Sequence, residues 1–206
     1  AESRLRIEDI VSGAEALPYC GKSAILLYGV FGTGKTTLAN MLPNAIEKGR
    51  SNEDLAIEAD FIACQQGFNG PQVMSLIERV LSKTSFNASG LHYFVLDEVD
   101  NLTKLAQQSL KSALNTNRGI FILTTNNISE LDKGLKDRCV LVEMNAAAIS
   151  DYLPLAKNLV SDMGVVMSDD DLLPTISAAK GSLRNLIHNV ERLARRSNPP
   201  PPNIIF

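Results

Sequence analysis

Residues 29–37 combine glycines, a lysine and threonines at a spacing that suits phosphate binding. The segment fits the pattern G-x-x-x-x-G-K-T and consists of Gly29, Val30, Phe31, Gly32, Thr33, Gly34, Lys35, Thr36 and Thr37. The glycines allow the backbone N–H groups to approach an anion closely, and a following helix N-terminus favours negative charge. Lys35 can neutralise β- and γ-phosphates, and the Thr36 hydroxyl can ligate Mg²⁺. This pattern, called a P-loop, predicts a polyphosphate site.

A second group of reactive side chains follows the apolar run His92–Leu96, where Asp97 and Glu98 stand side by side. In a chain that already has a phosphate-binding motif, Asp97 can hold Mg²⁺ and Glu98 can polarise an attacking water. An acidic pair at this place could instead cap a helix or lie in a surface loop.

The elements that must position these residues alternate between strands and helices. Strands are predicted at 24–28, 55–62, 92–96, 119–124 and 139–144, helices at 37–42, 72–81 and 102–115, and a polar loop at 47–54. This alternation predicts an α/β fold of the P-loop NTPase type, with a parallel sheet and helices on both faces. Ligands of such sheets bind at the carboxyl ends of the strands, which places both reactive groups at one edge.

The pattern changes near Asn145. No strand signal is found in residues 146–196, where three helices are expected at about 147–163, 169–180 and 182–195. We therefore predict an ATPase-type core at 1–145, a small three-helix lid at 146–196 and a proline-rich tail at 197–206. Residues 6–11 could lie against a nucleotide base or pack as an N-terminal arm.

Composition narrows the cellular setting. The net charge of −3 provides no overall attraction to nucleic acid or to an anionic membrane, so DNA contact would need a local basic patch. Cys20, Cys64 and Cys139 are an odd number without metal-site spacing, which indicates reduced thiols in a cytoplasmic compartment. No apolar run approaches the length of a membrane span, and no signal-peptide pattern is present, so no membrane partner is expected.

The order of these motifs resembles that of the AAA+ ATPases. Residues 29–37 look like a Walker A motif, and Tyr93–Glu98 look like a Walker B motif. The stretches 97–103 and 106–110 are similar to clamp-loader subunits of the replication factor C and bacterial gamma/tau type. The resemblance implies binding and hydrolysis of ATP with Mg²⁺ between core and lid, in a homo-oligomer or together with other AAA+ subunits.

The resemblance also implies roles for three further residues. Asn126, at the end of 121–126, would act as the first sensor and help to place the attacking water, although its neighbour Asn127 is an alternative. Arg138 would act as a finger on a neighbouring subunit's nucleotide, as in the family's Ser-Arg-Cys segment, but Asp137 stands where the serine is expected. Arg184 would be the second sensor. A solvated surface arginine remains the alternative for both Arg138 and Arg184.

Two departures from the clamp-loader pattern bear on function. Clamp loaders carry a helical collar after the lid, whereas this chain continues into prolines, and Glu58–Asp60 replace a polar switch residue, with Asp60 a candidate to restrain Glu98.

The leading hypothesis is an ATPase that remodels or loads a partner in DNA replication or recombination. Arg79, Lys83, Lys104 and Lys111 could contact DNA, or they could be solvated helix faces. The alternatives are a nucleotide-gated assembly module with little turnover and, less favoured, a small-molecule kinase.

Overall fold

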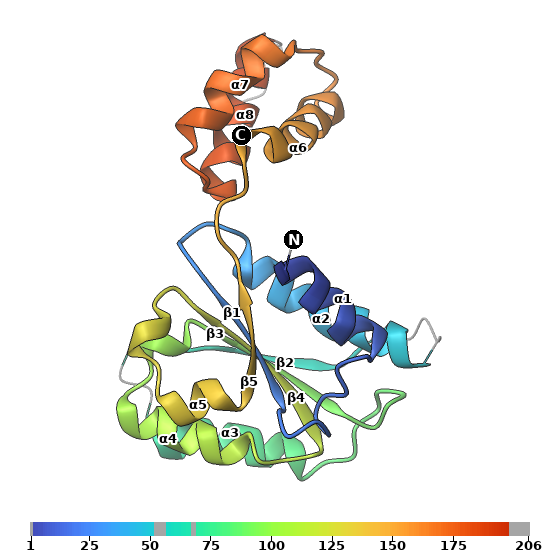
Figure 1. Cartoon of the computed structure of the whole chain (residues 1–206), viewed down its shortest axis with the longest axis vertical. Helices are drawn as coiled ribbons and strands as arrows, with labels where there is room; N and C mark the ends of the chain where they lie inside the picture. Colours follow the sequence, from blue (N-terminus) through green and yellow to red (C-terminus); the bar gives the residue numbers. More distant parts are fainter. Residues whose placement is uncertain (1, 52–56, 67–68, 198–206) are drawn as a thin grey trace, which may run out of the picture. The chain divides into compact units, whose positions relative to one another are not determined.

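The computed structural model describes residues 2–51, 57–66 and 69–197 and divides the chain into two compact units (Figure 1). The first unit comprises Ala1–Gly29 and Lys35–Met144, and the second comprises Val30–Gly34 and Asn145–Phe206. The predicted proline-rich tail falls almost entirely on residues 198–206, which lie outside the described residues.

A five-stranded parallel sheet forms the centre of the first unit. Its strands are β1 (Ala24–Tyr28), β2 (Ala59–Ala63), β3 (His92–Asp97), β4 (Gly119–Thr125) and β5 (Cys139–Glu143). They are ordered β2-β3-β4-β1-β5, and every neighbouring pair is parallel. The first strand of the chain therefore lies near the middle of the sheet, between β4 and β5.

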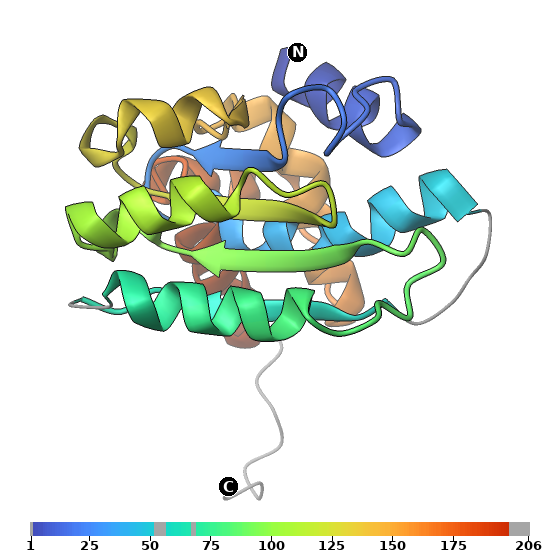
Figure 2. The same cartoon turned by 90° about the horizontal axis from the view of Figure 1, so that it is seen from below.

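Helices cover both faces of the sheet, as predicted. They are α1 (Glu2–Ser12), α2 (Lys35–Ser51), α3 (Gly70–Leu81), α4 (Lys104–Ala113) and α5 (Lys133–Asp137), with short 3₁₀ turns η1 (Val99–Asn101) and η2 (Ile128–Glu130). Successive strand residues point to opposite faces. Figures 1 and 2 show α3 and α4 on one face of the sheet and α1 and α2 on the other. Phe94 accordingly joins the core cluster under α3 and α4, and Tyr93 joins the cluster under α1 and α2.

Local sequence explains where several helices begin. Asn69 and Gln72 form a reciprocal capping box at the start of α3, with Pro71 in the first turn. The Thr103 side chain accepts a hydrogen bond from the Ala106 N–H and caps α4. These caps satisfy backbone donors that would otherwise lack partners.

The prediction of a polar loop at 47–54 is wrong for its first half, because α2 continues to Ser51. Glu47 is 1% exposed and accepts hydrogen bonds from Tyr93 and Ser89, so its polarity does not mark a surface loop. Gly49 does not mark a turn either, because a Cβ added there would clash with the carbonyl oxygen of Val11 in α1. The close approach of α1 to α2 therefore requires glycine.

The strand predicted at 55–62 is shorter than expected. The structure places β2 at Ala59–Ala63, and the first residues of the predicted strand lie outside the described part of the chain. At the N-terminus, residues 6–11 belong to α1. Ile10 is fully buried against α2, and Arg6 donates to the Leu141 carbonyl oxygen at 2.7 Å, so the described contacts are those of a packed arm.

The second unit is a three-helix cluster formed by α6 (Ile149–Asp162), α7 (Asp169–Ala178) and α8 (Leu183–Ser197). Its core consists of apolar residues that these helices share, among them Ala156, Ile176 and Val190. Gly164, with a φ of 71°, terminates α6, and the Val165 N–H closes the end by donating to the Val160 carbonyl oxygen. Among residues 2–51, 57–66 and 69–197, no helix is both long and apolar enough to cross a lipid bilayer.

Candidate functional site

The reactive groups predicted for the first unit meet at the carboxyl edge of its three central strands. Gly29 follows β1, Asp97 ends β3, and Asn126 directly follows β4. Because β3, β4 and β1 are adjacent and parallel, their carboxyl ends lie at the same edge of the sheet. Lys35 and Thr36, which begin α2, lie at this edge as well, because α2 follows β1 through the P-loop.

Asp97 lies at the centre of a compact hydrogen-bond network. The Thr36 hydroxyl donates to Asp97 Oδ1 at 2.8 Å, and the Thr124 hydroxyl donates to the same oxygen at 2.6 Å. Thr124 Oγ1 also accepts the Glu98 N–H at 2.9 Å. The predicted Mg²⁺-binding pair, Thr36 and Asp97, is thus in direct contact. Thr124 was not anticipated from the sequence, since a threonine near the end of a buried strand is also a common strand residue.

Lys35 is held in a largely buried position, 6% exposed, and its Nζ donates to the Gly29 carbonyl oxygen at 2.9 Å. Burial lowers the pKa of Lys35, while the nearby carboxylates of Asp100, Asp97 and Glu98 act in the opposite direction. Gly32 and Gly34 have φ values of 76° and 89°, which other residues adopt only with strain. The loop conformation therefore accounts for the glycines of the motif.

Glu98 has an unusual backbone for a non-glycine residue, with φ 57° and ψ 54°. Its side chain is exposed, and its carboxylate accepts from Asn101 Nδ2 at 3.2 Å and from Asn126 Nδ2 at 3.5 Å. Strained backbone of this kind is often found at functional sites. Asn101 also donates to the Cys64 carbonyl oxygen at 3.1 Å, a second positioning contact that sequence reasoning did not assign.

Asn126 and Asn127 are the two candidates for the side chain that helps to place the attacking water, and their contacts differ. Asn127 caps η2 by accepting from the Ser129 N–H, and its amide donates to Glu130. Asn126, in contrast, reaches Glu98. Asp60, considered as a restraint on Glu98, lies on the exposed edge strand β2, and the hydrogen-bond donors to the Glu98 carboxylate within the described residues are Asn101 and Asn126.

Among the predicted site residues of the first unit, Arg138 is not brought to this edge. Arg138 lies immediately before β5, at the amino end of the sheet, about 16 Å away along a five-residue strand. Its guanidinium donates to Asn115 Oδ1 at 2.8 Å and to the Gly134 carbonyl oxygen at 3.0 Å. Arg184 is exposed in the first turn of α8, in the second unit.

The donor set at the carboxyl edge fits Mg²⁺ bound together with a polyphosphate. Mg²⁺ prefers hard oxygen ligands and commonly uses one or two protein oxygens, with phosphate and water oxygens completing the shell. Thr36 and Asp97 provide one hydroxyl and one carboxylate at 2.8 Å from each other. In the described part of the chain, no cluster of three or more His, Cys, Asp and Glu side chains could hold a metal ion by itself.

The parallel sheet, the glycine loop and the acidic strand end define a P-loop NTPase fold with a helical C-terminal region. Residues 25–145 match the family described as "ATPase family associated with various cellular activities (AAA)", and the chain belongs to this family.

Several relatives within this family are named as replication factor C subunits. The chain is 27% identical over 197 residues to replication factor C small subunit 2 of Pyrobaculum arsenaticum, a match that covers 92% of this chain and 56% of that protein. It is 26% identical over 195 residues to replication factor C subunit 4 of Saccharomyces cerevisiae, covering 90% of this chain and 59% of that one. The chain thus spans a little over half the length of these relatives and is consistent with a clamp-loader-like AAA+ protein.

A solved structure supports the fold independently. The RuvB Holliday junction branch migration motor of Thermotoga maritima aligns with a TM-score of 0.66 at 19% identity, covering 93% of this chain and 59% of that one. At this level of identity, the likeness concerns the fold alone.

Proposed function

We propose that this chain is an ATPase that binds ATP with Mg²⁺ and couples hydrolysis to the remodelling or loading of a partner. The observation that carries the proposal is the contact of Thr36 and Thr124 with Asp97, next to Glu98 in its left-handed conformation. A structural salt bridge or a helix cap would not require an acidic pair directly beside the hydroxyl of a phosphate-binding motif.

The P-loop is assigned to the phosphates. Backbone N–H groups of residues 29–37, together with the N-terminus of α2, favour the anion, and Lys35 Nζ exchanges its contact with the Gly29 carbonyl oxygen for phosphate oxygens. Mg²⁺, bound through Thr36 and Asp97, supplies charge neutralisation on the phosphates.

Glu98 and Asn126 are assigned to the attacking water. Glu98 accepts a proton from that water at a carboxylate oxygen, and the Asn126 amide orients the water and Glu98. The 3.5 Å separation between Asn126 Nδ2 and Glu98 Oε1 leaves both groups only weakly engaged with each other. Each therefore gives up little when it binds a water.

Arg138 and Arg184 are assigned to nucleotide sensing and to oligomer formation. Arg138 lies at the opposite edge of the sheet from Lys35, so a role at the phosphates is best supplied to a neighbouring subunit. It lines a surface cavity of about 350 Å³ with Asn115 and Lys22, which keeps it accessible to such a neighbour. Arg184 is exposed and is assigned to the γ-phosphate of its own subunit. A guanidinium suits both tasks, because its planar fork matches phosphate oxygens.

We assign the remodelling or loading of the partner to DNA replication or recombination. The support for this assignment is that replication factor C subunits are among the proteins to which the sequence of this chain is similar. We assign a homo-oligomer or a hetero-oligomer with other AAA+ subunits as the working state, because Arg138 has a role only when a second subunit is present.

The test is steady-state ATPase activity measured against protein concentration, with and without primed or single-stranded DNA. Specific activity should rise with concentration and rise again with DNA. Lys35→Ala should abolish nucleotide binding, whereas Glu98→Gln should keep binding and lose turnover. Arg138→Ala should reduce activity only at concentrations where the wild type assembles.

The same experiment separates the ATPase from the alternative, a nucleotide-gated assembly module. Activity that stays flat and near zero while ATP still binds and promotes assembly would favour the module. Full activity of Arg138→Ala under assembling conditions would contradict the assignment of a finger acting between subunits.

A further inference from the structure

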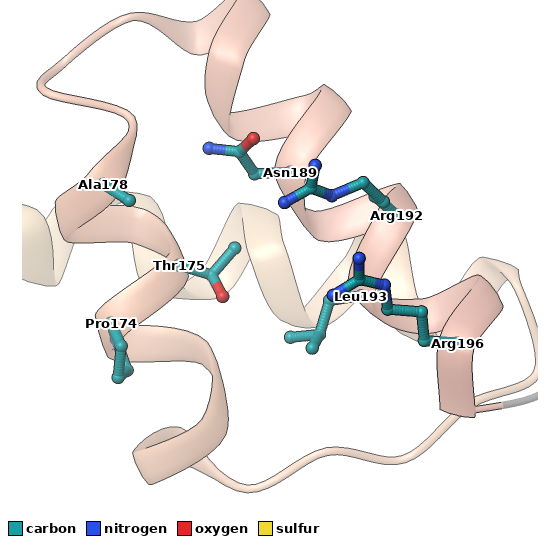
Figure 3. A pocket seen from close by; sticks show the side chains of 7 residues that line it. All are labelled: Pro174, Thr175, Ala178, Asn189, Arg192, Leu193 and Arg196. Carbon is teal, nitrogen blue, oxygen red and sulfur yellow. The ribbon is translucent and has the colours of Figure 1, made fainter.

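A groove in the second unit is lined by residues that have no role in the proposed nucleotide site. It has a volume of about 380 Å³ and is formed by the second half of α7 and the C-terminal half of α8 (Figure 3). Its lining residues are Pro174, Thr175, Ala178, Asn189, Arg192, Leu193 and Arg196. Figure 3 shows the side chains of Asn189, Arg192 and Arg196 following one another along α8 on the groove side.

Positive charge is concentrated on α8. Its sequence LRNLIHNVERLARRS contains four arginines and one glutamate, although the whole chain has a net charge of −3. Leu186, Val190 and Ala194 are its buried residues, so the arginines occupy the opposite, exposed face. The aspartates of α7 lie in its first turn, away from the half that lines the groove.

Arg192 and Arg196 are the central cations of this surface. Both are exposed, and among the residues described in the structure neither guanidinium has a hydrogen-bond or ion-pair partner. They are separated by four residues, which corresponds to about 6 Å along a helix. Arg195, by contrast, faces Glu191 at 4.0 Å.

The interaction of cations with the helix dipole explains only part of this group of polar side chains. Cations in a last turn stabilise a helix C-terminus by interacting with its dipole, and that accounts for Arg195 and Arg196. It does not account for Arg192, one turn earlier, or for the neutral donors Asn189 and Thr175 beside it in the groove. Arginine, asparagine and threonine side chains are the types that contact phosphate oxygens in protein–DNA complexes.

We propose that Arg192 and Arg196, with Asn189 and Thr175, form a binding surface for the phosphate backbone of duplex DNA. The inference deepens the proposed function, on whose DNA partner it rests. A duplex carries one negative charge per about 1.7 Å of axis, so two arginines about 6 Å apart can both engage phosphates. The groove lining includes no aromatic side chain on which an unpaired base could stack, which favours the backbone over exposed bases.

The test uses the full chain and a fluorescently labelled duplex, with anisotropy measured over a series of salt concentrations. The variant is Arg192→Gln/Arg196→Gln. The control is Arg4→Gln/Lys157→Gln, which removes the same charge from exposed side chains that pair with Glu8 and Asp169. Binding of a fluorescent ATP analogue and DNA-free ATPase activity are measured in parallel on each protein.

The logarithm of the association constant falls as the logarithm of the salt concentration rises. The loss of two phosphate contacts should make this slope less steep by about 2. Between about 50 and 200 mM salt, the wild-type affinity should therefore fall about 10-fold more than that of the variant. The control should keep the wild-type slope, and nucleotide binding should be unchanged in both.

An unchanged slope in Arg192→Gln/Arg196→Gln would overturn the inference, as would a wild-type chain that binds the ATP analogue but not the duplex. Polyglutamate serves as a second probe, which represents an acidic protein. If Arg192→Gln/Arg196→Gln loses polyglutamate binding but retains duplex binding, the surface binds an acidic protein and the inference fails. A chain without ATPase activity whose duplex binding still depends on the two arginines would support the inference while the proposed ATPase fails.

Discussion

Tyr93→Phe removes one hydroxyl from a buried carboxylate and tests how α2 is held to the sheet. Glu47, near the end of α2, accepts from Tyr93 Oη at 2.6 Å, from Ser89 Oγ at 2.8 Å and from the Ser89 N–H at 2.6 Å. The network joins the helix that begins with Lys35 to the strand that ends with Asp97. Phenylalanine keeps the packing of the ring, so the substitution isolates the hydrogen bond.

The expected loss follows from the charge and burial of Glu47. A hydrogen bond to a charged group contributes about 1.5–3 kcal/mol, and an acceptor that is 1% exposed cannot recover a water in exchange. We expect a loss of about 2 kcal/mol in the free energy of unfolding. For a chain of this length, that corresponds to a fall in Tm of about 4–8 °C. Urea unfolding should show a lower midpoint with an unchanged m-value.

Alkaline pH provides a second readout. Burial raises the pKa of Tyr93 above its usual value, and the hydrogen bond to Glu47 and its charge act in the same direction. A group with a raised folded-state pKa contributes stability that is complete below the unfolded pKa of about 10 and is lost as pH rises above it. The loss of stability above about pH 10 should therefore be less steep in Tyr93→Phe than in the wild type.

Tyr19→Phe is the matched control, because Tyr19 is 67% exposed and loses the same atom. It should change stability by less than about 0.5 kcal/mol. If Tyr93→Phe changed stability no more than Tyr19→Phe, the reasoning that Glu47 depends on its buried donors would be refuted.

Three further predictions follow from the site and the cysteines. Glu98→Gly should be about 1 kcal/mol more stable than Glu98→Ala, because only glycine relieves the left-handed backbone at φ 57°; equal urea midpoints would contradict this. Thr124→Val should keep ATP-analogue binding but lower turnover on the order of 10–100-fold, through loss of its contact with the metal-binding carboxylate; wild-type turnover would show that Thr124 is dispensable. Only the exposed Cys20 should react rapidly with a thiol reagent in the native chain, since burial raises the pKa of both Cys64 and Cys139 to about 12; all three should react after denaturation, and fast native reaction of a second thiol would contradict their burial.

Much of the first unit could be predicted from local sequence. Runs such as 92–96 and 119–124 are apolar over a strand's length, and the structure places β3 and β4 there. Each Walker-type motif is local as well, since the glycines and the lysine of the first lie within residues 29–37 and the acidic residues of the second are Asp97 and Glu98.

The errors arose where distant contacts override local signals. Glu47 and Gly49 read as a polar loop, yet both are helical. Glu47 is accommodated by Ser89 and Tyr93, more than 40 residues away, and Gly49 by the passage of α1. Neither neighbour is visible in a local sequence window, because tertiary contacts overrule propensity.

The sequence by itself determined which chemical groups the protein carries and in which local conformations, because glycine loops, strand runs and helix caps depend on neighbouring residues. Only the tertiary structure decided which groups meet. The insertion of β1 between β4 and β5 brings Thr36, Asp97 and Thr124 to one edge and leaves Arg138 at the other. Strand order is set by pairing between segments far apart in the chain, and that pairing depends on burying both sheet faces at once.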